Sequence, residues 1–294
     1  MGVGGADGTD AVPVPDVVAL FATCVVDVMQ PDVGVAAVRV LRATGCDVRF
    51  PSGQTCCGQP AWNSGFAADA ARVARTTLAA LEAAIEDGAT AVVAPSGSCT
   101  TMVRVFWPEL FELAGDHDAA VRARRVGVRT FELCEFVAGR SLPALSLPEP
   151  TSVAYHHSCH MLRELRVHEQ PVELLDRIDG CRRVMWADDE RCCGFGGLFS
   201  FKLPEASVAM ADDKLASVPV GPDGSDVEIV GADSSCLLHL RGRSQSEHSP
   251  VRTRHIAEVL AAALGGDRPP DPARSRVIAA RPEGDPEDGR TAPR

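Results

Sequence analysis

The sequence lacks any segment suited to crossing a membrane or directing export. The longest apolar run near its start, residues 17–26, is about half the length that a bilayer-spanning helix needs. The first 16 residues contain no basic residue, so the positive start of a secretory signal is missing, and Ala6 breaks the myristoylation pattern. We therefore expect a cytoplasmic protein without membrane insertion.

Nucleic-acid and nucleotide signatures are also missing. The net charge is −11, and the one basic run, residues 122–125, suits a solvated helix end better than a nucleic-acid-binding stripe. No expected strand is followed by Gly-x-Gly-x-x-Gly, and no Walker motif occurs. These absences argue against a nucleic-acid partner and against a nucleotide cofactor.

Cysteine, in contrast, is abundant, with 11 in 294 residues. Eight of these fall into two sets, each with a Cys-Cys-Gly turn, one cysteine well upstream and one well downstream. Matching members lie 135 to 137 residues apart, which indicates a duplicated unit. The first quartet is Cys24, Cys56, Cys57 and Cys99, and the second quartet is Cys159, Cys192, Cys193 and Cys236.

Each quartet predicts a metal centre. Adjacent cysteines on a glycine-containing turn can place two thiolates on one inorganic cluster, and four thiolates are the usual ligands of an iron–sulfur cluster. Zinc fits less well, because neither half has two cysteines separated by two to four residues. A redox disulfide between Cys56 and Cys57 would leave Cys24 and Cys99 unexplained, and inert burial is the remaining alternative. The other three cysteines are expected to pack in the core: Cys46, Cys134 and Cys181.

Histidines flank the first cysteine of the second quartet. His156, His157 and His160 surround Cys159. Such residues are most often structural or exposed, whereas the functional interpretation is a proton donor or a hydrogen bond to cluster sulfur. His157 and His160 are the catalytic candidates on this second interpretation.

Buried apolar runs alternate with helical patterns along the first half. This alternation implies right-handed crossovers and a mostly parallel sheet, with ligands beyond the carboxyl ends of the strands. Cys24 and Cys99 fall at such ends, each shortly before a helix start, where the helix dipole favours anionic thiolates. We expect strands at 17–22, 48–50 and 91–94, and helices from 31 to 45, 66 to 88 and 100 to 113.

The second half repeats this plan, so the predicted fold is α/β, with two tandem duplicated Rossmann-like βαβ domains and mostly parallel sheets. Its strands are expected at 152–156, 183–187 and 227–230, with helices from His160, over 203–218 and from Leu237. Matching segments that begin at Val128 and Val251 are expected to be helical, ending near Gly139 and Gly265. The expected domains are a disordered leader (1–15), a first Cys-Cys-Gly domain (16–142), a linker (143–150), a second Cys-Cys-Gly domain (151–265) and a disordered tail (266–294).

These motifs carry a resemblance over about residues 17–262. The chain resembles the lactate utilization protein A family and, more distantly, the Cys-Cys-Gly domain of heterodisulfide reductase and the iron–sulfur subunits of glycolate oxidase and anaerobic glycerol-3-phosphate dehydrogenase. The Cys-Cys-Gly turn is shared by many redox complexes, while the longer strings around it are more specific. These strings are residues 23–27, 53–60, 94–99, 159–165 and 193–200.

The resemblance implies an iron–sulfur electron-transfer subunit of a cytoplasmic complex that oxidises L-lactate to pyruvate. It further implies an oxidoreductase subunit acting with lactate utilization proteins B and C, with both quartets as ligands of two [4Fe-4S] clusters, one per half. Ser96 and Asp233 stand where the reductase type has the first cysteine of Cys-x-x-Cys, which favours ordinary clusters over the noncubane type, and His157 replaces an expected Asp. The alternatives are a heterodisulfide-reductase-like thiol–disulfide oxidoreductase subunit and a zinc-stabilised assembly scaffold.

Overall fold

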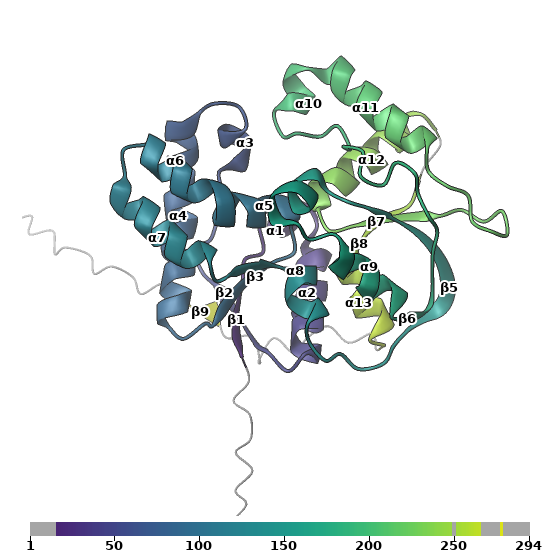
Figure 1. Ribbon diagram of the computed structural model, residues 1–294, viewed down its shortest axis with the longest axis horizontal. Coiled ribbons are helices and arrows are strands. Elements are labelled where there is room, and N and C mark those ends of the chain that lie inside the picture. The colour runs from purple at the N-terminus through teal and green to yellow at the C-terminus, as the bar shows by residue number, and fades with distance from the viewer. Residues whose placement is uncertain (1–15, 249–250, 266–276, 279–294) are drawn as a thin grey trace, which may run out of the picture.

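The strands of this computed structural model, which describes residues 16–248, 251–265 and 277–278, form two sheets (Figure 1). Every strand pair in them is parallel. The first sheet has the order β4-β3-β1-β2-β9 and the second the order β6-β5-β7-β8. Apart from β9 the two orders are the same, which confirms the predicted α/β class with duplicated domains. The strands are β1 (Val17–Leu20), β2 (Asp47–Pro51), β3 (Ala91–Ala94), β4 (Thr130–Glu132), β5 (Leu145–His156), β6 (Ile178–Arg183), β7 (Glu228–Gly231), β8 (Thr253–His255) and β9 (Val277–Ile278).

Helices connect the strands, and none in the described part of the chain is both long and apolar enough to cross a bilayer. Prolines at the first helical position start α2 and α11, where a missing amide hydrogen is tolerated. In the first half the helices are α1 (Cys24–Met29), α2 (Pro31–Ala43), α3 (Gln59–Trp62), α4 (Ala67–Glu86), α5 (Gly97–Thr101), the π-helical η1 (Met102–Phe106), α6 (Trp107–Leu113), α7 (His117–Gly127) and α8 (Leu133–Ala138). In the second half they are η2 (Met161–Leu165), α9 (Glu169–Asp176), α10 (Phe199–Lys202), α11 (Pro204–Ala216), α12 (Ser234–Ser246) and α13 (Ile256–Ala263).

The two halves share one inner core. Along β1 and the residue after it, Val18 and Leu20 face this inner core, while Ala19 and Phe21 face an outer one, as alternation along a strand requires. Helices α2 and α8 of the first half pack against α13 and α9 of the second, between the two sheets (Figure 1). Because this packing is apolar and largely buried, it fixes the two sheets relative to each other. The three cysteines outside the quartets belong to it, two buried and one at its edge: Cys46, Cys134 and Cys181.

Each half has a fourth strand that the sequence pattern did not predict. The segments from Val128 and from Val251 begin with β4 and β8, and only then turn into α8 and α13. Each of these strands has three residues, too few to show a period of two. Both helices start with a capping box, formed by Glu132 with Glu135 and by His255 with Glu258.

Three other boundaries differ from the expected ones. Strand β6 ends at Arg183, where the expected strand over 183–187 begins, and the expected linker over 143–150 contains the first half of β5. In the expected disordered tail, residues 277 and 278 form β9 beside β2. The remainder of that tail and the leader lie outside the described residues, and the domain boundaries stay a prediction.

The carboxyl group of Glu132, at the end of β4, should make stability depend on pH. Glu132 is completely buried, and burial raises its pKa to about 8, whereas it titrates near 4.5 in an unfolded chain. The folded protein therefore loses stability as pH rises from about 4.5 to about 8, on the order of 4 to 5 kcal/mol. Glu132→Gln keeps an oxygen for the helix cap and removes the charge. We expect its urea midpoint to exceed that of the wild type at pH 8.5 far more than at pH 5. The exposed Glu86→Gln is the control, and an equal difference at both pH values would contradict this prediction.

Candidate metal centre

All eight cysteines of the two quartets line a single cavity. It lies between the two halves and has a volume of about 150 Å³. In each half the cysteines follow the first three strands of the sheet at their carboxyl ends, as α/β topology predicts for a ligand site. Cys24 and Cys159 follow β1 and β5, the two Cys-Cys pairs follow β2 and β6, and Cys99 and Cys236 follow β3 and β7 on α5 and α12.

The sulfur atoms of the first quartet form a continuous hydrogen-bonded chain. Cys24 contacts Cys56, Cys56 contacts Cys57, and the Sγ of Cys57 lies 3.4 Å from that of Cys99. The amide of Gly58 donates to the Sγ of Cys56 at 3.4 Å. The hydrogen bonds from Cys24, Cys57 and Gly58 lower the pKa of the Cys56 thiol well below its usual range. The first quartet thus has a thiol that ionises readily at its centre.

The second quartet repeats this arrangement. Cys159, Cys192, Cys193 and Cys236 contact one another in that order. The amide of Gly194 donates to the Sγ of Cys192 at 3.4 Å. Hydrogen bonds, first from Cys159, lower the pKa of the Cys192 thiol, while the contact with Cys192 raises that of Cys159. The thiol with the lowered pKa therefore occupies the matching place in both halves.

Buried polar groups hold the first turn in place. The indole of Trp107 donates to the carbonyl of Cys57 at 2.8 Å, and the hydroxyl of Thr77 donates to that of Cys56 at 3.2 Å. Just before Cys24, Thr23 has φ 73° and ψ 152°, a conformation that non-glycine residues rarely adopt. Strain in the backbone at Thr23 indicates that the surrounding fold fixes the orientation of the next residue, Cys24.

Ser96 and Asp233 hold the two halves together at the cavity. Each caps the helix that carries the last cysteine of its quartet, because Ser96 accepts from the amide of Cys99 and Asp233 from that of Ser235. The second carboxylate oxygen of Asp233 also accepts from the amide of Ser98 in the other half, at 2.9 Å. Ser and Asp are preferred residues at helix N-termini, so the sequence could have predicted that these two residues cap their helices. No sequence pattern predicts the hydrogen bond between Ser98 and Asp233 across the two halves.

Replacing Asp233 should therefore loosen both helices at once. We expect Asp233→Ala to lower the free energy of unfolding by about 2 kcal/mol, from the lost cap on α12 and the lost acceptor for Ser98. Asp233→Asn retains an acceptor oxygen and should lose less than half as much. Urea denaturation of the three proteins measures the difference. Equal losses for both variants would show that the carboxylate charge, and not the cap, matters.

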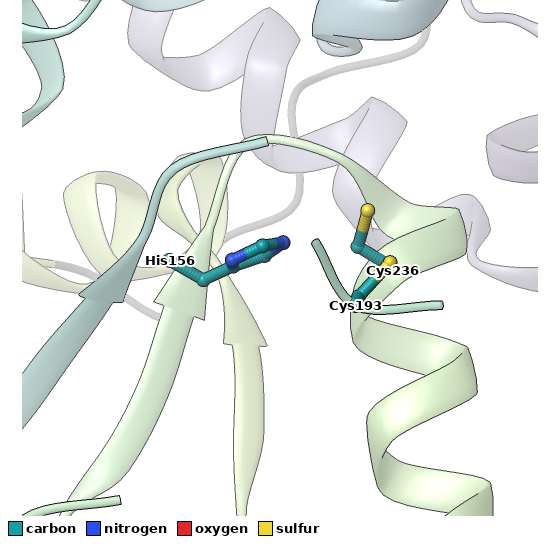
Figure 2. A group of neighbouring side chains, drawn as sticks. All are labelled: His156, Cys193 and Cys236. Carbon is teal, nitrogen blue, oxygen red and sulfur yellow. The ribbon is translucent and has the colours of Figure 1, made fainter. Parts of the chain in front are cut away.

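The histidines of the sequence motif occupy three different places. His160 lines the cavity, with Nδ1 3.3 Å from a carboxylate oxygen of Glu164. His157 lies outside it, in a separate small pocket, with Nε2 3.8 Å from Asp189. His156 is buried behind the second quartet, and its imidazole points toward Cys193 and Cys236 (Figure 2). Its ligand nitrogen and the two sulfur atoms lie within 4.8 Å of one another.

The donors in this cavity fit a sulfur-ligated metal group. Four thiols converge in each half, one of them in each with a lowered pKa, and thiolate is the form that binds metal. The Nε2 of His156 is buried and has no hydrogen-bond partner among the described residues. Buried polar atoms are normally paired, so an unpaired nitrogen next to the sulfur atoms fits a site that takes up a further group. The quartets are the residues that would hold it.

Comparison with known proteins agrees with this arrangement. The cysteine-rich domain family, CCG, matches residues 18–104 and 153–241, one match in each half. Lactate utilization protein A of Exiguobacterium sp. is 41% identical over 244 residues, covering 83% of this chain and 96% of the relative. The protein of the same name from Bacillus subtilis is 39% identical over 244 residues, covering 83% and 98%. A solved structure of a hypothetical protein from Helicobacter pylori is similar at a TM-score of 0.54 and 11% identity over 86% of this chain. The chain spans about half the length of that protein, and the similarity concerns the fold alone.

Proposed function

The chain belongs to the lactate utilization protein A family, with two cysteine-rich domains, and we propose that it is an iron–sulfur electron-transfer subunit of a complex that oxidises L-lactate to pyruvate. The observation that carries the proposal is the convergence of both quartets on one cavity. Eight thiols from six strand ends, in two matching arrangements, are the ligands expected for two clusters.

The residues around the cavity suit electron transfer better than chemistry on a bound substrate. When bound, [4Fe-4S] clusters accept and release single electrons at potentials set by charge, hydrogen bonds and exposure. In each half, the quartet would hold the cluster, and the amide of Gly58 or Gly194 would donate to a ligand sulfur. Cys57 and Cys193 are almost completely buried, which keeps water from the sulfur atoms. The proposed partners are the lactate utilization proteins B and C, in the cytoplasm.

Anaerobic purification with iron and sulfide assays tests the proposal. We expect about eight iron atoms and eight sulfides per chain after reconstitution, and an EPR signal after reduction. Fewer than about two iron atoms per chain would contradict the proposal, and zinc without sulfide would support the scaffold alternative instead. Turnover of a disulfide with an artificial donor, without any requirement for lactate, would support the reductase alternative.

A further inference from the structure

The surroundings of the two quartets differ at two matching positions. The position three residues before the first cysteine of each quartet holds Phe21 in the first half and His156 in the second. The helices after the turns, α4 and α11, match at an offset of 137 residues, since Ala70 and Ser207 approach the equivalent glycines. At this offset Thr77 in the first half corresponds to Lys214 in the second. A neutral ring and a hydroxyl are thus replaced by an imidazole and an ammonium.

Lys214 is one of only two lysines among the 29 Lys and Arg residues of the chain, and its exposed fraction is 0%. Its ammonium donates to the carbonyls of Asp188 and Asp189 at 2.6 and 2.9 Å, and lies 4.2 Å from the centre of the Trp186 ring. Burial lowers the pKa of Lys214 to about 8, so the group remains charged at neutral pH. A buried charge is costly unless an anion compensates it.

The carboxylates of Asp188 and Asp189 each lie beside another side chain. That of Asp188 pairs with Arg191, and that of Asp189 lies beside His157. Among the described residues, Lys214 forms no ion pair within 4 Å, and its closest contacts are the two carbonyls. Its charge is stabilised electrostatically first by Cys193, and then by Asp189, Cys236 and Asp188. The partner that contributes most to this stabilisation, Cys193, thus belongs to the second quartet.

We propose that Lys214 makes the group bound by the second quartet the better electron acceptor of the two, so that an electron shared between the halves resides in the second. This rests on the proposed function. Each added electron makes a thiolate-bound cluster more negative, and a fixed positive charge in a low-dielectric interior stabilises that state. The first quartet has Thr77 at this place and gains no such stabilisation. Lys214 would act on the bound group through its charge alone and is not proposed as a ligand.

Redox titrations followed by EPR test this inference. The reconstituted wild type should show two midpoint potentials, of which the higher persists in Cys57→Ser and disappears in Cys193→Ser. Lys214→Gln keeps a donor for the two carbonyls and removes the charge. We expect it to lower the higher potential by at least about 59 mV, a tenfold change in the one-electron equilibrium constant. Lys214→Arg keeps the charge and should shift the potential by less than half as much.

The exposed Lys202→Gln, which removes a charge screened by solvent, is the matched control and should leave both potentials unchanged. If the higher potential persists in Cys193→Ser, the assignment is overturned without any lysine variant. The inference is also overturned if Lys214→Gln leaves the potentials unchanged, or if Lys214→Gln and Lys214→Arg shift them equally. Lys214 would then have a structural role only. A wild type without iron would instead contradict the proposed function itself.

Discussion

Cys57→Ser and Cys193→Ser are each expected to retain about half of the iron and sulfide of the wild type, and the double variant almost none. Each of these cysteines is nearly fully buried and lies between two other cysteines of its quartet. A ligand from the surface therefore cannot replace the lost thiol. Because the two quartets come from separate sheets, loss of one should leave the other intact. Iron and sulfide assays and the amplitude of the EPR signal after reduction measure the effect.

Cys181→Ser is the matched control for this experiment. Cys181 also lies in the duplicated part of the chain and is half-buried, but it packs beside the inner core and not in the cavity. The Cys181→Ser variant should therefore retain all of the iron of the wild type. Loss of all iron from either single variant would show that the eight thiols hold one joint group, and no loss would contradict the ligand assignment.

Gly194→Ala should destabilise the second half strongly. Gly194 has φ +86°, and a Cβ there would lie 2.5 Å from the carbonyl oxygen of Ser207 and 3.0 Å from Cβ of Met210. The backbone conformation alone disfavours alanine by about 1 to 2 kcal/mol, and the contact with α11 adds to this. We expect a loss of about 3 kcal/mol or more in the free energy of unfolding, measured by urea denaturation, with the iron of the second quartet reduced as well.

Gly224→Ala separates the two causes. Gly224 has φ +76° but no atom within 4 Å of the added Cβ, so only the conformational cost of about 1 to 2 kcal/mol applies. If Gly194→Ala cost no more than Gly224→Ala, the second Cys-Cys-Gly turn would be able to move away from α11. The turn would then not be held as rigidly as the structure indicates.

The pairing of the two halves explains why a duplicated protein need not be symmetric in function. The inner core and the contact of Asp233 with Ser98 keep both quartets at one cavity. The residues that surround the two quartets nevertheless differ, as Thr77 and Lys214 do at matching positions of the two halves. A shared cavity with unequal surroundings would suit the electron-transfer role proposed above.

The sequence by itself determined the class of the fold, the duplication and the grouping of the cysteines. Local apolar patterns predict buried strands such as residues 91–94 and long helices such as α4. The spacing of the cysteines alone indicates the duplication. The short strands β4 and β8 could not be predicted, because three residues carry no period and only pairing with β3 and β7 makes them strands.

Only the tertiary structure decided how the two halves meet. Three features join residues that are distant in sequence. They are the placement of both quartets at one cavity, the hydrogen bond from Ser98 to Asp233 and the burial of Lys214 beside the second quartet. Such contacts depend on the packing of α2 and α8 against α13 and α9. Local propensity and spacing act within a segment, whereas the environment of a buried charge is set by every segment that packs around it.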